Sequence, residues 1–291
     1  MNGFINSLYK STVMLSVPLI LCSLGGLITF HSGMINVAME GMMLSGAFTA
    51  VVVSFITRNP YLAMTAAMAI GVVFSLLYSL FVITLKTNNF AIGIAINIFV
   101  SSLTLFLTRI MFIGEDAFNS PDLVAIPKIT VDFGSSIINT LFSDFSILVY
   151  LSLMLVVAVN FMVYKTPYGL WIRATGSCPA ALSVAGKSTG MVQYTSSILS
   201  GMLCGLAGAQ LSLSNVVLFS RNMTAGRGFM CLAAILITKG KPYRVLVMSI
   251  LFGLFNALAI HLQYFNIPTY FLSMVPYIMA IATMIMIDVK R

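Results

Sequence analysis

Residues 61–85 read YLAMTAAMAIGVVFSLLYSLFVITL, and this stretch contains no charged side chain. It is longer than the ~20 apolar residues that an α-helix needs to cross the ~30 Å hydrocarbon core of a bilayer. Backbone polar groups in lipid must be satisfied within a helix or a closed β-barrel. The stretch also lacks the apolar–polar alternation of a membrane β-strand. A transmembrane helix is therefore predicted here.

The rest of the chain repeats this pattern. Of its 291 residues, 59% are hydrophobic and 8% are charged, whereas a soluble domain carries about 25% charged residues. The other apolar segments are 12–30, 36–56, 90–108, 146–164, 191–213, 226–260 (interrupted) and 269–287. The predicted fold class is an all-α integral membrane protein with about eight transmembrane helices, in which residues 1–291 form a single transmembrane domain surrounded by the lipid bilayer.

Two polar, glycine-containing stretches interrupt the apolar pattern, near 32–45 and 213–238. The apolar run 229–238 is too short to cross the hydrocarbon core alone. Broken or re-entrant helices are tolerated at membrane depth only where they are buried in protein or line a water-filled cavity. The two interruptions therefore favour a transporter over a passive anchor.

The distribution of charge predicts an orientation. Lys and Arg give the chain a net charge of +8, but they are scattered between apolar segments, which argues against a nucleic-acid partner. Loop 165–189 is basic and has no acid, whereas loop 109–145 carries Glu115, Asp116, Asp122, Asp132 and Asp144. The positive-inside rule then makes 165–189 and the C-terminus cytoplasmic and 109–145 extracytoplasmic. Arg58, on the outer side, is an exception.

No motif for catalysis or metal binding is present. The chain has no G-x-x-x-x-G-K-[ST] loop, so it is not expected to bind and hydrolyse ATP itself, and no side-chain arrangement suggests a catalytic residue. Cys22, Cys178, Cys204 and Cys231 form no C-x-x-C pair, so no metal site is expected. Cys178 is the only one of the four expected to lie in water.

Glu40 is the only acidic residue inside an apolar segment. An ionisable group at membrane depth is costly and marks a candidate substrate or gating residue. The alternative role is structural: with Asn36 as the N-cap, Glu40 would lie in the first turn of its helix, where a carboxylate is favoured.

Four further polar residues are candidates for the substrate path. Asn97 and Asn256 are single amides in apolar helices, where hydrogen bonding between helices is the alternative to substrate contact. Asn222 and Arg227 lie in the second interruption, the kind of place where polar groups meet a solute. The small residues Gly201, Gly205 and Ala209 allow close helix approach, within the chain or against a second one.

Loop 165–189 contains a short segment that is too polar to span a membrane. Pro179 suits the first position of a short helix, and Gly186 suits its end. Such a helix, lying on the cytoplasmic face, is suited to docking into a groove on another protein.

At this loop the sequence resembles the ABC importer permeases of the branched-chain amino acid, ribose and nucleoside group, and the resemblance extends over residues 25–287 except for a patchy part at 109–145. The shared stretches are 168–176, then Pro179, Ala181, Ala185 and Gly186, then 200–210, 222–229 and 34–43. The stretch 222–229, NMTAGRGF, is the most specific. Together with MINVAMEGMM at 34–43 it resembles the permeases of nucleoside importers, especially the shorter of their two permease chains.

The resemblance implies a location in a bacterial cytoplasmic membrane and several partners. They are a second permease subunit, a cytoplasmic ATPase with two nucleotide-binding halves, and an extracytoplasmic substrate-binding lipoprotein. ATP and Mg would be bound by the ATPase, with no cofactor on this chain. The helix near 177–186 would dock on that ATPase, with Gly176, Pro179, Ala181, Ala185 and Gly186 marking the coupling loop. Relatives usually carry acids near this proline, where this chain has Ser177 and Ala180.

The expected function is thus that of a membrane-spanning permease subunit of an ATP-driven importer for purine or other nucleosides. It is not expected to be an enzyme. A permease for a sugar or an amino acid is the alternative within the same class. A gradient-driven secondary transporter is the alternative from another class, and it would be expected to show more than one intramembrane acid.

Overall fold

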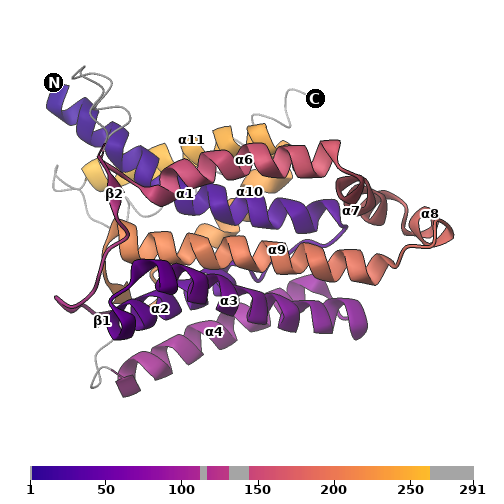
Figure 1. Ribbon diagram of the computed structural model, residues 1–291, viewed down its shortest axis with the longest axis horizontal. Helices are drawn as coiled ribbons and strands as arrows, with labels where there is room; N and C mark the ends of the chain where they lie inside the picture. The colour runs from indigo at the N-terminus through magenta and orange to yellow at the C-terminus, as the bar shows by residue number, and fades with distance from the viewer. Residues whose placement is uncertain (1, 112–116, 131–143, 263–291) are drawn as a thin grey trace.

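The computed structural model describes residues 2–111, 117–130 and 144–262. Most of these residues are helical, and the long helices run side by side along the longest axis of the molecule (Figure 1). The long helices are α1 (Asn2–His31), α2 (Met39–Thr57), α3 (Pro60–Ser79) with the π-helical turn η1 (Leu80–Thr84), α4 (Asn89–Met111), α6 (Ile147–Lys165), α9 (Thr189–Gln210) with η2 (Leu211–Asn215), and α11 (Pro242–Leu262). The short helices are α7 (Pro167–Ser177), α8 (Pro179–Val184) and α10 (Arg227–Thr238).

This architecture confirms the predicted all-α membrane fold. Within the described ranges, seven helices are long and apolar enough to cross a membrane. The predicted segment 269–287 lies outside the described residues. The segment 226–260 is two helices, α10 and α11, separated by a turn at Lys239 and Gly240, both of which have positive φ.

Two helix starts differ from the sequence prediction. α1 begins at Asn2 rather than near residue 12, because the helix continues past its apolar part through polar residues such as Asn6 and Lys10. α2 begins at Met39 rather than 36, so the first break covers only residues 32–38 and does not reach 45.

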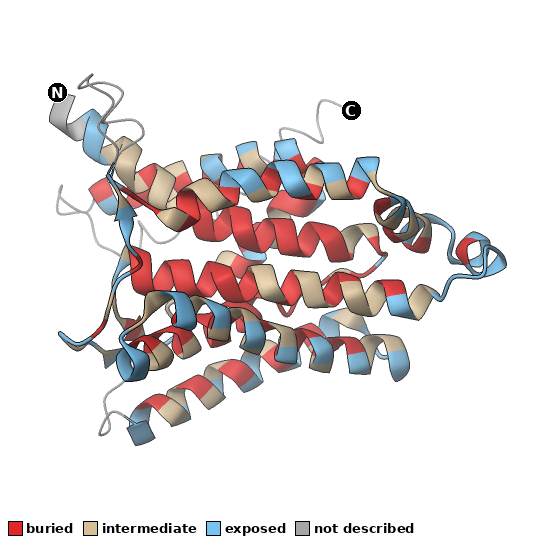
Figure 2. Ribbon diagram, in the orientation of Figure 1, coloured by how far each residue is buried: buried red, intermediate tan, exposed pale blue. Residues whose placement is uncertain are grey.

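Three helices form the interior of the bundle. Most of α1, α2 and α9 is buried, whereas most of α3, α4 and α6 is not (Figure 2). Packing between α3 and α9 depends on glycines: a Cβ on Gly201 would lie 2.6 Å from the Ser75 Cβ and would also contact the Gly71 carbonyl. The small residues of α9 therefore serve close packing within this chain.

Two short antiparallel strand pairs lie at one end of the bundle. β1 (Ala117–Phe118) pairs with β4 (Phe219–Ser220), and β2 (Lys128–Ile129) pairs with β3 (Phe145–Ser146). The first pair joins the loop after α4 to the loop before α10. The N-terminal part of α1 lies at this same end, where Lys10 forms an ion pair with Asp144 at 3.1 Å.

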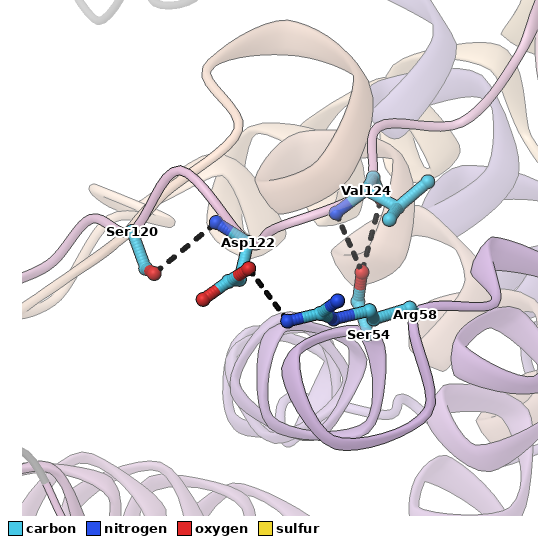
Figure 3. A network of polar contacts seen from close by, with 5 residues as sticks. All are labelled: Ser54, Arg58, Ser120, Asp122 and Val124. Carbon is cyan, nitrogen blue, oxygen red and sulfur yellow. Dashed lines mark hydrogen bonds and ion pairs between the residues drawn. The ribbon is translucent and has the colours of Figure 1, made fainter.

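A network of polar contacts fixes the loop 117–130 on the end of α2 (Figure 3). Arg58 Nη2 lies 2.7 Å from Asp122 Oδ1, and the Asp122 main-chain N–H donates to Ser120 Oγ. Ser54 Oγ donates to the Val124 carbonyl and accepts from the Val124 N–H. The Arg58 charge, the exception to the positive-inside pattern, is therefore paired locally. Both side chains of this ion pair are exposed, so it contributes little stability, about 0–1 kcal/mol.

Candidate functional site

The break at residues 32–38 returns the chain from the end of α1 into the middle of the bundle (Figure 1). It begins at Gly33, whose φ of 83° lies in the left-handed region that favours glycine. Side chains from other helices donate hydrogen bonds to main-chain carbonyls of the break. Gln193 Nε2 donates to Ser32 O at 3.3 Å, and the Tyr78 hydroxyl donates to Ile35 O at 3.0 Å. These bonds replace the helical bonds that the break gives up, as burial at membrane depth requires.

Asn36 stabilises the break rather than capping α2 directly. Its Oδ1 accepts from the Ala38 N–H at 3.0 Å, and its Nδ2 donates to Ser200 Oγ at 3.3 Å. The N-cap residue of α2 is Ala38, which makes no side-chain cap. The prediction that Asn36 is the N-cap is therefore wrong; its amide instead forms a local turn and ties the break to α9.

Glu40 caps a helix other than its own. The Gly226 and Gly228 N–H groups donate to its carboxylate at 2.8 and 2.6 Å, respectively, and Glu40 is 7% exposed. These donors belong to the start of α10, where unsatisfied N–H groups and the helix dipole favour a negative charge. A Cβ on Gly228 would lie 2.6 Å from the Glu40 nitrogen, so glycine is needed for this close approach.

Asn97 joins the same cluster from α4. Its Oδ1 accepts from the Gly41 N–H at 2.8 Å, and its Nδ2 donates to Val37 O at 2.9 Å. Asn97 therefore accepts a main-chain N–H at the start of α2, as Glu40 does at the start of α10. Because Asn97 lies near the middle of α4 and Ser200 near the middle of α9, these bonds place the starts of α2 and α10 at about half the height of the bundle.

The other candidate path residues lie apart from this cluster or at its edge. Asn222 is exposed in the turn before α10, with φ 53°. Arg227, at the start of α10, donates from Nη1 to Met223 O at 2.9 Å. Asn256 donates to Phe252 O, one turn back in α11, at 2.9 Å. The structure thus brings Glu40, Asn97 and the Arg227 backbone region together, and it leaves Asn256 on another helix.

The arrangement at the meeting point of α2 and α10 has a chemical consequence. The start of a broken helix inside a membrane is suited to binding an anionic group of a solute. Here the carboxylate of Glu40 already occupies that position, and both of its oxygens accept N–H groups. A solute that passes this point therefore does not need to supply a carboxylate or a phosphate.

Sequence reasoning missed several residues that build the cluster. Tyr78 and Gln193 contribute single hydrogen bonds from helices distant in sequence, which no local pattern announces. The role of Gly226 and Gly228 could have been predicted from the sequence. Two glycines on either side of Arg227, directly before a short apolar run, indicate a helix start that another backbone segment approaches closely. In the described part of the chain, no group of three or more His, Cys, Asp or Glu side chains could hold a metal ion.

The loop 165–189 lies at the end of the bundle opposite the strands (Figure 1). α8 begins at Pro179, and Gly186 follows it with φ 72°, as the proline and glycine predicted. Ala181 and Ala185 are exposed, together with Ser177 and Ala180, and Val184 is 90% exposed. Leu182 alone of α8 is buried, and it anchors the helix to the bundle.

Gly176 connects this loop to the break after α1. A Cβ at Gly176 would collide with the His31 carbonyl and would lie 3.0 Å from the Gly33 nitrogen. The end of α7 therefore rests directly on the chain segment that leads to Glu40.

Comparison with known proteins places this chain among transport permeases. Residues 8–284 match the family described as branched-chain amino acid transport system, permease component. The guanosine ABC transporter permease protein NupQ of Bacillus subtilis is 31% identical over 93% of this chain and 88% of its own length. The nucleoside ABC transporter permease protein NupC of Lactococcus lactis is 31% identical over 91% of this chain and 87% of its own.

A third relative is named for a different solute. The Haloferax volcanii ABC transporter permease protein TsgC13, provisionally named for glucose, is 31% identical over 90% of this chain and 79% of its own. No solved structure matches the chain.

Proposed function

This chain belongs to the permease component family of branched-chain amino acid transport systems, and from that premise we propose that it forms half of the path by which an ATP-driven importer carries purine or other nucleosides into a bacterial cytoplasm. It is a multi-pass membrane transport subunit and not an enzyme. This family membership sets aside a gradient-driven secondary transporter. The observation that carries the choice of solute is the similarity, along almost the whole chain, to two permeases named for guanosine and for nucleosides.

The contacts of Glu40 support an uncharged solute. An amino acid would bring a carboxylate into the path, and the position that a broken helix offers to such a group is filled by Glu40 itself. Nucleosides and sugars bring no anion, so both are compatible with this arrangement. The named relatives favour nucleosides, and a sugar is the second candidate because of the relative provisionally named for glucose.

The partners follow from the two ends of the bundle. An ABC permease works with an ATPase and a substrate-binding protein. We assign ATPase docking to loop 165–189, because α8 projects from the bundle and is almost entirely exposed (Figure 2). ATP and Mg are then bound by an ATPase with two nucleotide-binding halves, and this chain holds no cofactor. The opposite end, with loop 109–145, faces a substrate-binding lipoprotein, and a second permease subunit completes the path.

With this assignment, loop 165–189 is cytoplasmic and loop 109–145 is extracytoplasmic. We propose the cytoplasmic side for the C-terminus as well, from the positive-inside pattern of the sequence. Since Lys10 pairs with Asp144, the N-terminal end of α1 then lies outside.

Uptake measurements test the solute. A host without its own nucleoside transporters is given this chain together with its second permease, ATPase and binding protein, and takes up labelled guanosine, glucose or leucine. Guanosine uptake that depends on this chain is expected, with little uptake of the other two. Glucose uptake in its place would support the sugar candidate, and leucine uptake would contradict the choice of a solute without a carboxylate.

A second measurement tests the energy source. The purified chain is expected to bind no ATP, whereas the complete complex in proteoliposomes is expected to hydrolyse ATP faster when the binding protein is loaded with nucleoside. Specific ATP binding by the isolated chain would contradict the proposal.

A further inference from the structure

Arg173, in α7, is a half-buried cation without a hydrogen-bond acceptor among the described residues. Its guanidinium carbon lies 5.3 Å from the centroid of the Tyr164 ring, and its Nε is buried and has no partner in the described ranges. A guanidinium has five N–H donors, and leaving a buried donor unsatisfied costs free energy. By contrast, Arg58 is paired with Asp122, and Arg227 donates to a carbonyl. The terminal Nη groups of Arg173 are the donors that an external acceptor would satisfy, because the buried Nε is out of its reach.

The surroundings of Arg173 are positively charged. The Tyr164 ring lies 6.1 Å from the His31 ring, and His31 Nε2 donates to the Gly240 carbonyl at 2.8 Å. Gly240 lies between Lys239 and Lys241, both exposed. The sequence contains no Asp or Glu anywhere from residue 145 to 262. Within the described ranges, the helices and turns that meet here therefore carry cations and no carboxylate, so the acceptor that suits the site is an anion.

The exposed face of α6 indicates where this anion comes from. Val157, Phe161 and Tyr164 follow one another at helical spacing and are 56%, 60% and 36% exposed. They form a stripe of apolar and aromatic side chains that leads along the bundle to Arg173. Trp171 lies two residues before Arg173 on α7, on a different face of that helix, and a Lys187 amine lies 4.7 Å from its ring. Aromatic and basic residues at the end of an apolar stripe are typical of the membrane–water interface.

We propose that Arg173, assisted by Lys239 and Lys241, binds the phosphate of an anionic lipid in the leaflet at this end of the bundle, with the acyl chains along Val157, Phe161 and Tyr164. The guanidinium donates to the phosphate oxygens, and the lysines add longer-range attraction. A soluble phosphate would satisfy Arg173 but would leave the apolar stripe without an occupant. A carboxylate on an ATPase partner is less favoured, because α8, not this side of α6 and α7, projects from the bundle.

The single tryptophan of the chain, Trp171, lies on the same helix as Arg173 and reports on lipid at this end of the bundle. The complete chain is reconstituted in bilayers in which either phosphatidylglycerol or phosphatidylcholine carries bromine near the head of its acyl chains, and quenching of Trp171 fluorescence is measured. The wild type is expected to show stronger quenching by the brominated phosphatidylglycerol. Arg173→Gln is expected to lower this preference about fivefold, the factor that corresponds to ~1 kcal/mol for one basic residue near an anionic surface. A smaller preference for phosphatidylglycerol is expected to remain in this variant, because the Lys187 amine beside Trp171 is unchanged.

The control is Lys86→Gln, which removes one positive charge at the same end of the bundle, between α3 and α4. It is expected to keep the wild-type preference. Should Arg173→Gln fail to fold, Arg173→Lys, which keeps the charge but not the forked geometry, is expected to keep part of the preference. Equal quenching by the two lipids in the wild type would overturn the proposal. So would loss of the preference on adding the ATPase, which would identify a protein contact.

Discussion

At the scale of single residues, the polar side chains inside this bundle act on helices other than their own. Glu40 satisfies two N–H groups at the start of α10, and Asn97 satisfies one N–H and one carbonyl at the start of α2. Hydrogen bonds to a charged group contribute about 1.5–3 kcal/mol each, more than neutral ones. The two residues therefore hold together two helix starts that hydrophobic packing alone would leave with unpaired backbone groups.

Replacing Glu40 with Gln tests the cap on α10. The amide keeps one acceptor, but its NH₂ group faces an N–H that needs an acceptor, and the negative charge at the helix start is lost. We expect a loss of about 1–3 kcal/mol in stability, seen as a lower thermal unfolding midpoint of the purified chain. We expect transport by the assembled complex to be largely retained, because the contacts of Glu40 are with backbone groups of its own chain. Unchanged stability together with abolished uptake would instead place Glu40 in the gating or substrate-binding step.

Asn97 and Asn256 form a matched pair of amides. Asn97→Ala leaves the buried Gly41 N–H and Val37 carbonyl without partners, so it is expected to cost about 1–3 kcal/mol. Asn256 bonds only to a carbonyl of its own helix, so Asn256→Ala is expected to cost less than ~1 kcal/mol. Thermal unfolding of both variants measures the difference. If the two variants were equally stable, Asn97 would not hold α4 to the start of α2.

At the scale of elements, the two broken helices support one another. The break 32–38 and the start of α10 meet at Glu40, and their other ends meet where His31 Nε2 donates to Gly240 O. α9 passes beside the break and packs closely on α3 through glycine. The irregular backbone that reaches the middle of the bundle thus lies where side chains of α3, α4 and α9 satisfy its polar groups.

Gly201 and Gly190, both in α9, test this packing. Gly201→Ala places a methyl group against Ser75 and Gly71 of α3, and overpacking of this kind costs about 1–3 kcal/mol. At Gly190 a Cβ meets nothing closer than 3.7 Å, so Gly190→Ala is expected to cause no loss. Thermal midpoints and the yield of folded protein give the comparison. A tolerated Gly201→Ala with a harmful Gly190→Ala would contradict the close α3–α9 contact.

At the scale of the whole molecule, the two ends of the bundle are chemically different. One end carries strands, Asp122 and Asp144, and the N-terminal end of α1 (Figure 1). The other end carries loop 165–189 and an excess of Lys and Arg. This asymmetry supports the proposed orientation, since basic loops are retained in the cytoplasm.

Thiol labelling measures this orientation. Cys178 is exposed, whereas Cys22, Cys204 and Cys231 are buried. A membrane-impermeant maleimide is expected to label inside-out vesicles stripped of the ATPase but not intact cells, and Cys178→Ser is expected to remove the signal. Docking of the ATPase on α8 is expected to slow the labelling.

A second cysteine supplies the opposite control. Ser7 is exposed near the start of α1. In the Cys178→Ser background, Ser7→Cys is expected to be labelled from outside intact cells. Labelling of both positions from the same side would contradict the arrangement of α1 and loop 165–189 at opposite ends.

The sequence by itself determined the class of the protein and the position of most spans. Uncharged runs such as 61–85 leave a helix in lipid as the only stable choice, because no water is available to the backbone. Breaks near 32–45 and 213–238 were predicted for the same reason, from polar glycine-containing stretches, and the structure confines them to 32–38 and 216–226. The short helix at Pro179 followed from local backbone preferences, which act without tertiary contacts.

Only the tertiary structure decided what the polar residues do. Asn36 was expected to cap α2, and Glu40 was left between a substrate or gating role and a structural role in the first turn of its own helix. A carboxylate at the start of α2 can also reach another helix start, and the N–H groups that it meets depend on where α10 lies. Tyr78, Gln193 and Asn97 complete the site from three other helices, across separations that no sequence periodicity records. A buried backbone group must find a partner somewhere, and the packing of the bundle determines which side chain supplies it.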